Sequence, residues 1–134
     1  IKMLKKILSI SGKPGLHKFV SQSKNMIIVE SLMDGKRFPA YSHERVISLG
    51  DISIYTQTEE VPLAEVFEKI KLKTNAEKAI CEKSSEADLR AYFEEILPDY
   101  DKSRVYKSDV KKVIQWYNIL IEKGFTDFLA EEEA

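Results

Sequence analysis

The sequence is short of the residues that most often build reactive or metal-binding sites. Its 134 residues include one cysteine, Cys81, and two histidines, His17 and His43. One cysteine excludes an intramolecular disulfide and any site made of several cysteines, and the charged neighbours Glu82 and Lys83 suit an exposed linker rather than a reactive thiol. No stretch approaches the roughly 20 apolar residues of a membrane span. We therefore expect a protein of the cytoplasm without metal, cofactor or membrane segment.

The overall composition is that of an ordinary globular chain. Hydrophobic residues make up 43% and charged residues 32%, which excludes a collagenous or wholly disordered protein. The whole-chain net charge of −1 indicates no partner. The charge is uneven, however, because residues 1–58 carry nine Lys or Arg and four Asp or Glu, while residues 59–134 carry twelve and eighteen. The positive half could attract the negative half or face a polyanion.

Up to residue 58 the pattern is that of short strands separated by turns. Apolar runs occur at 7–10, 16–20, 26–32, 38–41, 46–49 and 52–55. Asp34-Gly35 favours a two-residue hairpin turn, and Pro39 favours an edge strand because proline cannot donate to a ladder. Five or six strands in fewer than 60 residues predict a small curled antiparallel sheet or an SH3-like barrel.

After residue 58 the apolar spacing becomes helical. Four apolar side chains after Pro62 share one helix face, and they are Leu63, Val66, Phe67 and Ile70. Residues 71–84 are polar and predict a linker or a frayed helix end. A second helix is expected between Ser85, with Asp88 three residues on, and Pro98.

The third helix is expected from near Ser108 to Gly124, since glycine favours the left-handed conformation at a helix end. Apolar residues cover so much of its circumference that it must be buried on more than one side. It therefore packs on the second helix and on either the β module or another subunit. Trp116 and Ile119 widen its apolar face and are the candidates for self-association into a homo-oligomer.

No catalytic pattern is present in the sequence. The pairs Gly12-Lys13 and Gly35-Lys36 lack the remaining residues of a phosphate-binding loop. His17 and His43 have no partner specified by spacing, so surface histidines are the favoured interpretation. We expect that the protein is not an enzyme.

The candidate binding residues are basic and aromatic side chains that alternate near the fourth expected strand: Lys36, Arg37, Phe38, Tyr41, His43 and Arg45. Cations that hold phosphates and rings that stack on bases are how many RNA-binding modules work. The alternative is that Phe38 and Tyr41 fill the core while the charges keep an edge strand soluble. Both interpretations remain open at this stage.

Several segments together resemble a family of small uncharacterised proteins from Bacteroidota, labelled only as a domain of unknown function. They are residues 4–16, 29–32, 39–41 and 46–52, followed by 89–93, 104–106 and 116–118. The resemblance implies a small β module followed by helices in a cytoplasmic bacterial protein. It implies no activity and no functional residue.

The sequence thus predicts an α+β chain in three parts. Residues 1–58 form a small SH3-like barrel or curled sheet, 59–83 a helix and polar linker, and 84–134 a helical hairpin with an acidic tail. The expected function is a non-catalytic binding or adaptor protein with an unidentified protein partner. The alternative is RNA or ribosome binding through the basic-aromatic residues.

Overall fold

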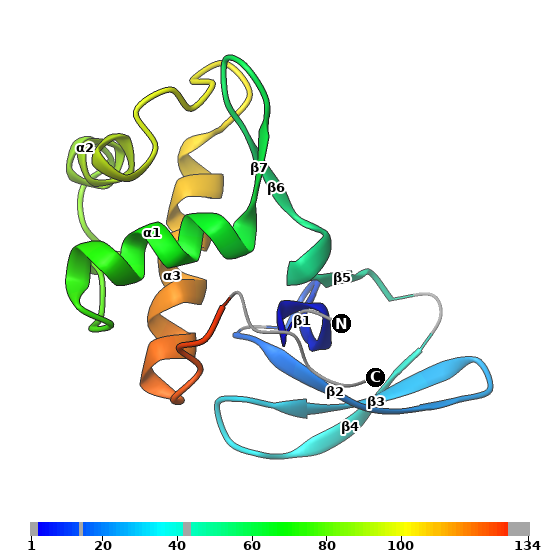
Figure 1. Ribbon diagram of the computed structural model, residues 1–134. Coiled ribbons are helices and arrows are strands. Elements are labelled where there is room, and N and C mark those ends of the chain that lie inside the picture. Colours follow the sequence, from blue (N-terminus) through cyan, green and yellow to red (C-terminus); the bar gives the residue numbers. More distant parts are fainter. Residues whose placement is uncertain (1–2, 14, 42–43, 129–134) are drawn as a thin grey trace. The chain divides into compact units, whose positions relative to one another are not determined.

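The computed structural model describes residues 3–13, 15–41 and 44–128, which form two compact units (Figure 1). Unit 1 is the part up to Ile52, and unit 2 begins at Ser53. Residues 53–58, which the sequence pattern places with the β module, lie in unit 2. The α+β class is confirmed, because a five-stranded antiparallel sheet precedes three helices.

Unit 1 is an antiparallel sheet with two 3-10 turns. Its elements are η1 (Met3–Lys6), β1 (Ile7–Ile10), β2 (His17–Ser23), β3 (Met26–Ser31), β4 (Arg37–Tyr41), β5 (Val46–Ser48) and η2 (Leu49–Asp51). The strand order is β4-β3-β2-β1-β5, so the first strand pairs with both the second and the fifth. Among the described residues no ladder joins β4 to β5, and the sheet is open there. The strand that contains Pro39 is at one end of this order, as predicted.

The register of β2, β3 and β4 sorts their side chains onto two faces. Phe19, Val29 and Phe38 lie opposite one another and pack on the core cluster of this unit, which includes Leu8 and Ala40. Alternate residues of a strand point to opposite faces. The intervening row Lys18, Glu30 and Arg37 is therefore on the outer face. A bulge between Phe19 and Ser21 interrupts this register in β2.

The β3–β4 hairpin is confirmed, but its turn is longer than the two residues predicted. Ser31 closes the loop by donating its backbone N–H to the Lys36 carbonyl, 2.9 Å away. Within the loop, Gly35 donates to the Ser31 carbonyl at 2.8 Å and has φ +76°. Asp34 accepts the Lys36 N–H at 3.0 Å. These local hydrogen bonds stabilise a wider turn, which uses the glycine at its single left-handed position.

Unit 2 begins with a second, two-stranded sheet. The segment expected to complete the β module is β6 (Ser53–Tyr55), and it pairs with β7 (Glu60–Pro62) rather than with the sheet of unit 1. β7 is not predicted by the sequence pattern, because adjacent carboxylates such as Glu59 and Glu60 are typical of a solvated segment. Buried Thr56 determines the turn between the two strands: its hydroxyl oxygen accepts the N–H groups of Thr58 and Glu59 at 3.2 and 2.9 Å.

Three helices follow: α1 (Leu63–Thr74), α2 (Glu86–Ile96) and α3 (Lys107–Glu122). Ser85 caps α2 by accepting the Asp88 N–H at 3.2 Å, and Gly124 has φ +84°, so both predicted helix signals are confirmed. The core of the unit includes the rings of Phe67, Tyr117 and Phe128, each with 0% of its surface exposed. No helix in the described part of the chain is long and apolar enough to cross a membrane.

The segment between α1 and α2 is attached to α3 by side-chain hydrogen bonds. The Asn118 Oδ1 accepts the Ala79 N–H at 2.7 Å, and its Nδ2 donates to the Ile80 carbonyl at 3.1 Å. The Tyr117 hydroxyl donates to the Glu77 carbonyl at 2.8 Å and lies 2.9 Å from the Thr74 hydroxyl. The predicted polar linker therefore follows a specific path along α3.

Candidate functional site

The basic and aromatic residues around β4 are divided between two faces of the sheet. Phe38 packs against the core, with its ring 5.3 Å from that of His17. Arg37 and Tyr41 occupy the alternate positions of the same strand, and 47% of the Tyr41 surface is exposed. Strand alternation thus separates residues that are adjacent in the sequence. Phe38 packs on the core, as the alternative interpretation predicts. Tyr41, which that interpretation also places in the core, is accessible.

The positive charges of this cluster differ in their surroundings. Lys36 and Arg45 are exposed, whereas the Arg37 Nε lies 3.0 Å from the Glu30 carboxylate of the neighbouring strand. An exposed ion pair of this kind contributes little stability but partly neutralises the charge. His43 lies outside the described residues. The described part of the cluster therefore has three exposed cations, one of them paired with Glu30, and one exposed ring.

A hollow of about 300 Å³ opens beside the β2–β3 hairpin of unit 1. It is lined by Gln22, Ser23, Asn25, Met26, Ile27, Ala40, Tyr41, Glu44 and Val46. Ala40 belongs to the apolar core cluster, and the partly buried Ile27 and Val46 pack against that cluster, so the hollow borders the core. Apolar concavities with a few polar groups, including the mouths of small barrels, are common ligand sites. This hollow is therefore a candidate binding site of unit 1.

Glu44 supplies the negative charge of this lining. Its Oε2 accepts the backbone N–H of Tyr41 at 3.3 Å, and its own N–H donates to the Tyr41 carbonyl at 3.0 Å. These two bonds hold the Glu44 carboxylate beside Tyr41. An apolar floor, an exposed ring and a carboxylate are therefore adjacent.

His17 is buried, which corrects the expectation of a surface histidine. Only 3% of its surface is exposed, because its position on β2 lies between Leu8 of β1 and Ser31 of β3. Its Nδ1 is buried without a hydrogen-bond partner among the described residues. Burial lowers the pKa of the imidazole, and Lys13 lowers it further, against an opposing effect of Asp34. The imidazole is therefore a neutral part of the core.

The two residues suggested for self-association lie on α3 with different exposure. Ile119 is 8% exposed and so packs within the chain itself, whereas Trp116 is half-buried. The broad apolar circumference of this helix is consistent with burial inside unit 2, where α3 contacts α2, the Phe67 ring and the Phe128 ring. The two residues do not form a joint exposed patch.

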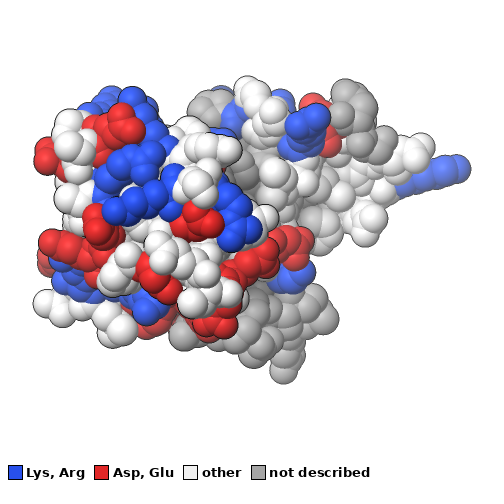
Figure 2. Space-filling view, turned by 90° about the horizontal axis from the view of Figure 1, so that it is seen from above, with Lys and Arg blue, Asp and Glu red and all other residues white. Residues whose placement is uncertain are grey.

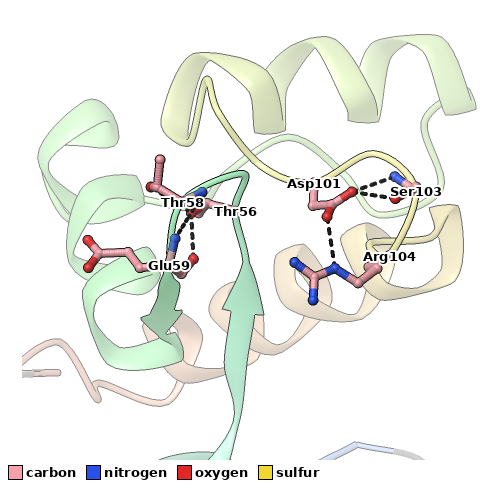
Figure 3. Close-up of polar contacts among 6 residues, drawn as sticks. All are labelled: Thr56, Thr58, Glu59, Asp101, Ser103 and Arg104. Atoms are coloured by element: carbon pink, nitrogen blue, oxygen red, sulfur yellow. Dashed lines mark hydrogen bonds and ion pairs between the residues drawn. The ribbon is translucent and has the colours of Figure 1, made fainter.

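Two polar clusters in unit 2 stabilise turns (Figure 3). Asp101, on the loop between α2 and α3, accepts from the Ser103 hydroxyl at 2.6 Å and from the Arg104 Nε at 2.8 Å. These bonds lower the pKa of the Asp101 carboxyl to about 2, with Ser103 as the larger cause. Arg104 also stacks 4.4 Å above the Tyr55 ring. These contacts join the loop to the β6–β7 hairpin, so the polar groups of this cluster have a structural role.

The charged surface of unit 2 is mixed in sign. Figure 2 shows Lys or Arg side chains next to Asp or Glu over the helices, at the left of that view. Ion pairs such as Lys78–Glu122 at 3.3 Å and Lys102–Glu94 at 3.5 Å account for part of this mixing. In the described part of the chain, no three His, Cys, Asp or Glu side chains gather closely enough to hold a metal ion.

Most residues of the hollow were not singled out from the sequence. Tyr41 was, but Gln22, Met26, Glu44 and Val46 come from different strands and turns and share no motif. The alternation of β3 and β4 could have placed Ile27 and Ala40 on the inner face. Nothing in the sequence indicates that the core is open beside them.

Comparisons with known proteins divide the chain near the boundary of the two units. Residues 4–49 match the family described as "Domain of unknown function (DUF5606)", and residues 52–120 match "Domain of unknown function (DUF6852)". No curated protein matches the chain.

A solution NMR structure of a protein from Bacteroides vulgatus is similar to this chain. The two are 56% identical, the match covers 94% of this chain and 91% of the other, and the TM-score is 0.78. This similarity extends over both units and confirms the resemblance noted in the sequence. The chain belongs to a family of uncharacterised Bacteroidota proteins in which an N-terminal β domain and a C-terminal helical domain, both of unknown function, occur together.

Proposed function

We propose that this protein is a non-catalytic binding or adaptor module of the bacterial cytoplasm, and that unit 1 carries its binding surface. The observation that carries the proposal is the hollow at the hairpin end of the sheet, where the apolar core opens beside the exposed Tyr41 ring. Tyrosine and methionine are favoured at protein interfaces because they supply large, adaptable contact surfaces. Both line this hollow.

We also infer that unit 1 is a partly opened SH3-like barrel. The pairing of β1 with both β2 and β5 and the bulge in β2 support this inference, because a small sheet curls most easily where its register is interrupted. In the barrel, the hollow would be the mouth between β4 and β5. Nuclear Overhauser contacts between these two strands are expected in solution, and their absence would count against closure.

Affinity capture with matched variants tests the binding function. Tagged wild type, Tyr41→Ala and Leu72→Ala are incubated with nuclease-treated lysate of a Bacteroidota species. Leu72 is a suitable control because it is an exposed apolar residue of unit 2, with 71% of its surface exposed. We expect a defined protein that is retained by wild type and Leu72→Ala and lost with Tyr41→Ala. A partner lost equally with both variants would refute the assignment to unit 1, and turnover in a broad hydrolase screen would refute the non-catalytic assignment.

RNA or ribosome binding is the second candidate. It is favoured by the exposed Lys36 and Arg45, the exposed Tyr41 ring and the excess of positive charge in unit 1. Against it, Arg37 is paired with Glu30 and Phe38 packs inward. Counterion release predicts an affinity for single-stranded RNA that falls steeply with salt. Binding that is undetectable at low salt, or unchanged by Arg37→Glu with Arg45→Glu, would eliminate this candidate.

A further inference from the structure

The hollow in unit 1 has a lining chemistry that restricts its occupant. Among the described residues that line it, Glu44 is the one charged residue and none is Lys or Arg. A phosphate of a nucleic acid would meet the Glu44 carboxylate rather than a cation, and like charges in a partly desolvated site repel. The lining therefore favours a neutral or positively charged ligand.

The size of the hollow restricts the occupant further. A cavity of about 150 Å³ lined by apolar side chains can hold one benzene. The hollow of about 300 Å³ in unit 1 has room for one large apolar group, such as a two-ring side chain. Its core-facing residues Ile27, Ala40 and Val46 would contact that group, and the Tyr41 ring would cover it from the rim.

The remaining lining groups suit the backbone of a polypeptide. Gln22 and Asn25 supply amides and Ser23 a hydroxyl, which can donate to and accept from peptide groups. These residues lie on the β2–β3 hairpin. An extended segment that inserted one side chain could therefore form hydrogen bonds with these polar groups.

We propose that the hollow binds one large apolar side chain of a partner polypeptide, and that Glu44 pairs with a basic residue next to it in that polypeptide. This proposal rests on the proposed binding function and names the chemistry of the partner. The apolar group supplies most of the affinity, because a buried anchor in a pocket dominates most interfaces. The Glu44 carboxylate favours polypeptides in which a basic residue lies next to the apolar side chain.

Three short peptides test the proposal with the full-length protein. The probes are acetyl-Gly-Arg-Trp-Gly-amide, acetyl-Gly-Glu-Trp-Gly-amide and acetyl-Gly-Arg-Gly-Gly-amide, titrated into isotope-labelled protein while backbone amide shifts are recorded. We expect the Arg-Trp peptide to shift the amides of residues 22–27, 40, 44 and 46. It should bind about two- to fivefold more tightly than the Glu-Trp peptide, the range of a solvent-exposed ion pair. The peptide without tryptophan should not bind.

Glu44→Gln is the decisive variant. Glutamine keeps a side-chain oxygen that can accept the Tyr41 N–H, so this hydrogen bond is retained while the charge is removed. We expect the preference for the Arg-Trp peptide to vanish in this variant. Glu60→Gln, at an exposed position of β7 in unit 2, is the matched control and should keep the preference.

Each other outcome overturns a stated part of the inference. Equal binding of the Arg-Trp and Glu-Trp peptides to wild type would refute the role of Glu44. Shifts that cluster outside the hollow, shifts of the hollow amides by single-stranded RNA, or no binding by any peptide at millimolar concentration would refute the hollow as a peptide site. In those cases capture of a Tyr41-dependent partner from lysate would still decide the binding function by itself.

Discussion

Asn118 is predicted to hold the segment between α1 and α2 against α3. Its side chain makes two hydrogen bonds, one with the Ala79 N–H at 2.7 Å and one with the Ile80 carbonyl at 3.1 Å. A neutral hydrogen bond contributes about 1 kcal/mol net, and leaving partly buried partners unpaired adds to the loss. Asn118→Ala should therefore lower the free energy of unfolding by about 2 kcal/mol. For a chain of this size that corresponds to a fall in Tm of roughly 6–10 °C.

Urea denaturation is a suitable assay because the single tryptophan, Trp116, lies two residues from Asn118 on the same helix. Hydrogen exchange provides a local measurement, since the Ala79 amide should lose protection in Asn118→Ala. Asn118→Asp separates the two bonds: the carboxylate can still accept from Ala79, but it faces the Ile80 carbonyl with no donor. We expect Asn118→Asp to be destabilised at least as much as Asn118→Ala at neutral pH.

Gln115→Ala is the control on the same helix, because the Gln115 side chain makes no hydrogen bond to any residue that the structure describes. It should change the free energy of unfolding by less than about 0.5 kcal/mol, as most partly exposed substitutions do. If Asn118→Ala were as stable as this control, or if the Ala79 amide exchanged at the wild-type rate, the two hydrogen bonds would not hold the segment.

Three further predictions concern single groups. His17 has a lowered pKa in the folded protein, so the unfolded chain binds the proton more readily. The free energy of unfolding, measured in urea titrations, should therefore fall as pH decreases through about 6.5. His17→Leu should remove that dependence, and a flat wild-type profile between about pH 7 and pH 5 would contradict it. Asp101 has a pKa of about 2 against an ordinary 3.8, so it should contribute stability that is present above its ordinary pKa and lost as pH falls towards 2. Carbon NMR of the carboxyl measures this pKa. Asp101→Asn should remove the pH dependence. Thr56→Val should lower the free energy of unfolding by about 2–3 kcal/mol, because it removes the hydroxyl that accepts hydrogen bonds in the β6–β7 turn. Thr58→Val, at an exposed position, should have little effect. Equal losses of stability in denaturation experiments would show that the Thr56 hydroxyl is not the cause.

The helices were predictable because their signals are local. The i, i+3, i+4 spacing from Leu63, the cap at Ser85 and the glycine at 124 each depend on residues within one or two turns. The first helix continues to Thr74, beyond its last predicted apolar residue, because its last turn is stabilised by tertiary contacts. The Thr74 hydroxyl bonds to the Ile70 carbonyl and contacts Tyr117 of α3.

The strands were located from their apolar runs, but their partners were not. Ile54 and its neighbours have the composition of a strand whether they pair with the sheet of unit 1 or with β7. The choice depends on the buried Thr56 turn and on backbone bonds from Gln57 to Asp99 and from Asp101 to Tyr55, more than 40 residues away in the chain. Pairing between distant segments has no signal in a local pattern.

The sequence by itself determined the α+β class, the order of a β part and a helical part, and the accessible thiol at Cys81, since composition and periodicity decide these. Only the tertiary structure decided which side chains share a surface. Strand alternation turned Phe38 inward and Tyr41 outward, buried His17 between two strands, and brought Met26, Tyr41 and Glu44 to one hollow. The physical reason is that a site in a small sheet is assembled across strands, by register and curvature, rather than along the chain.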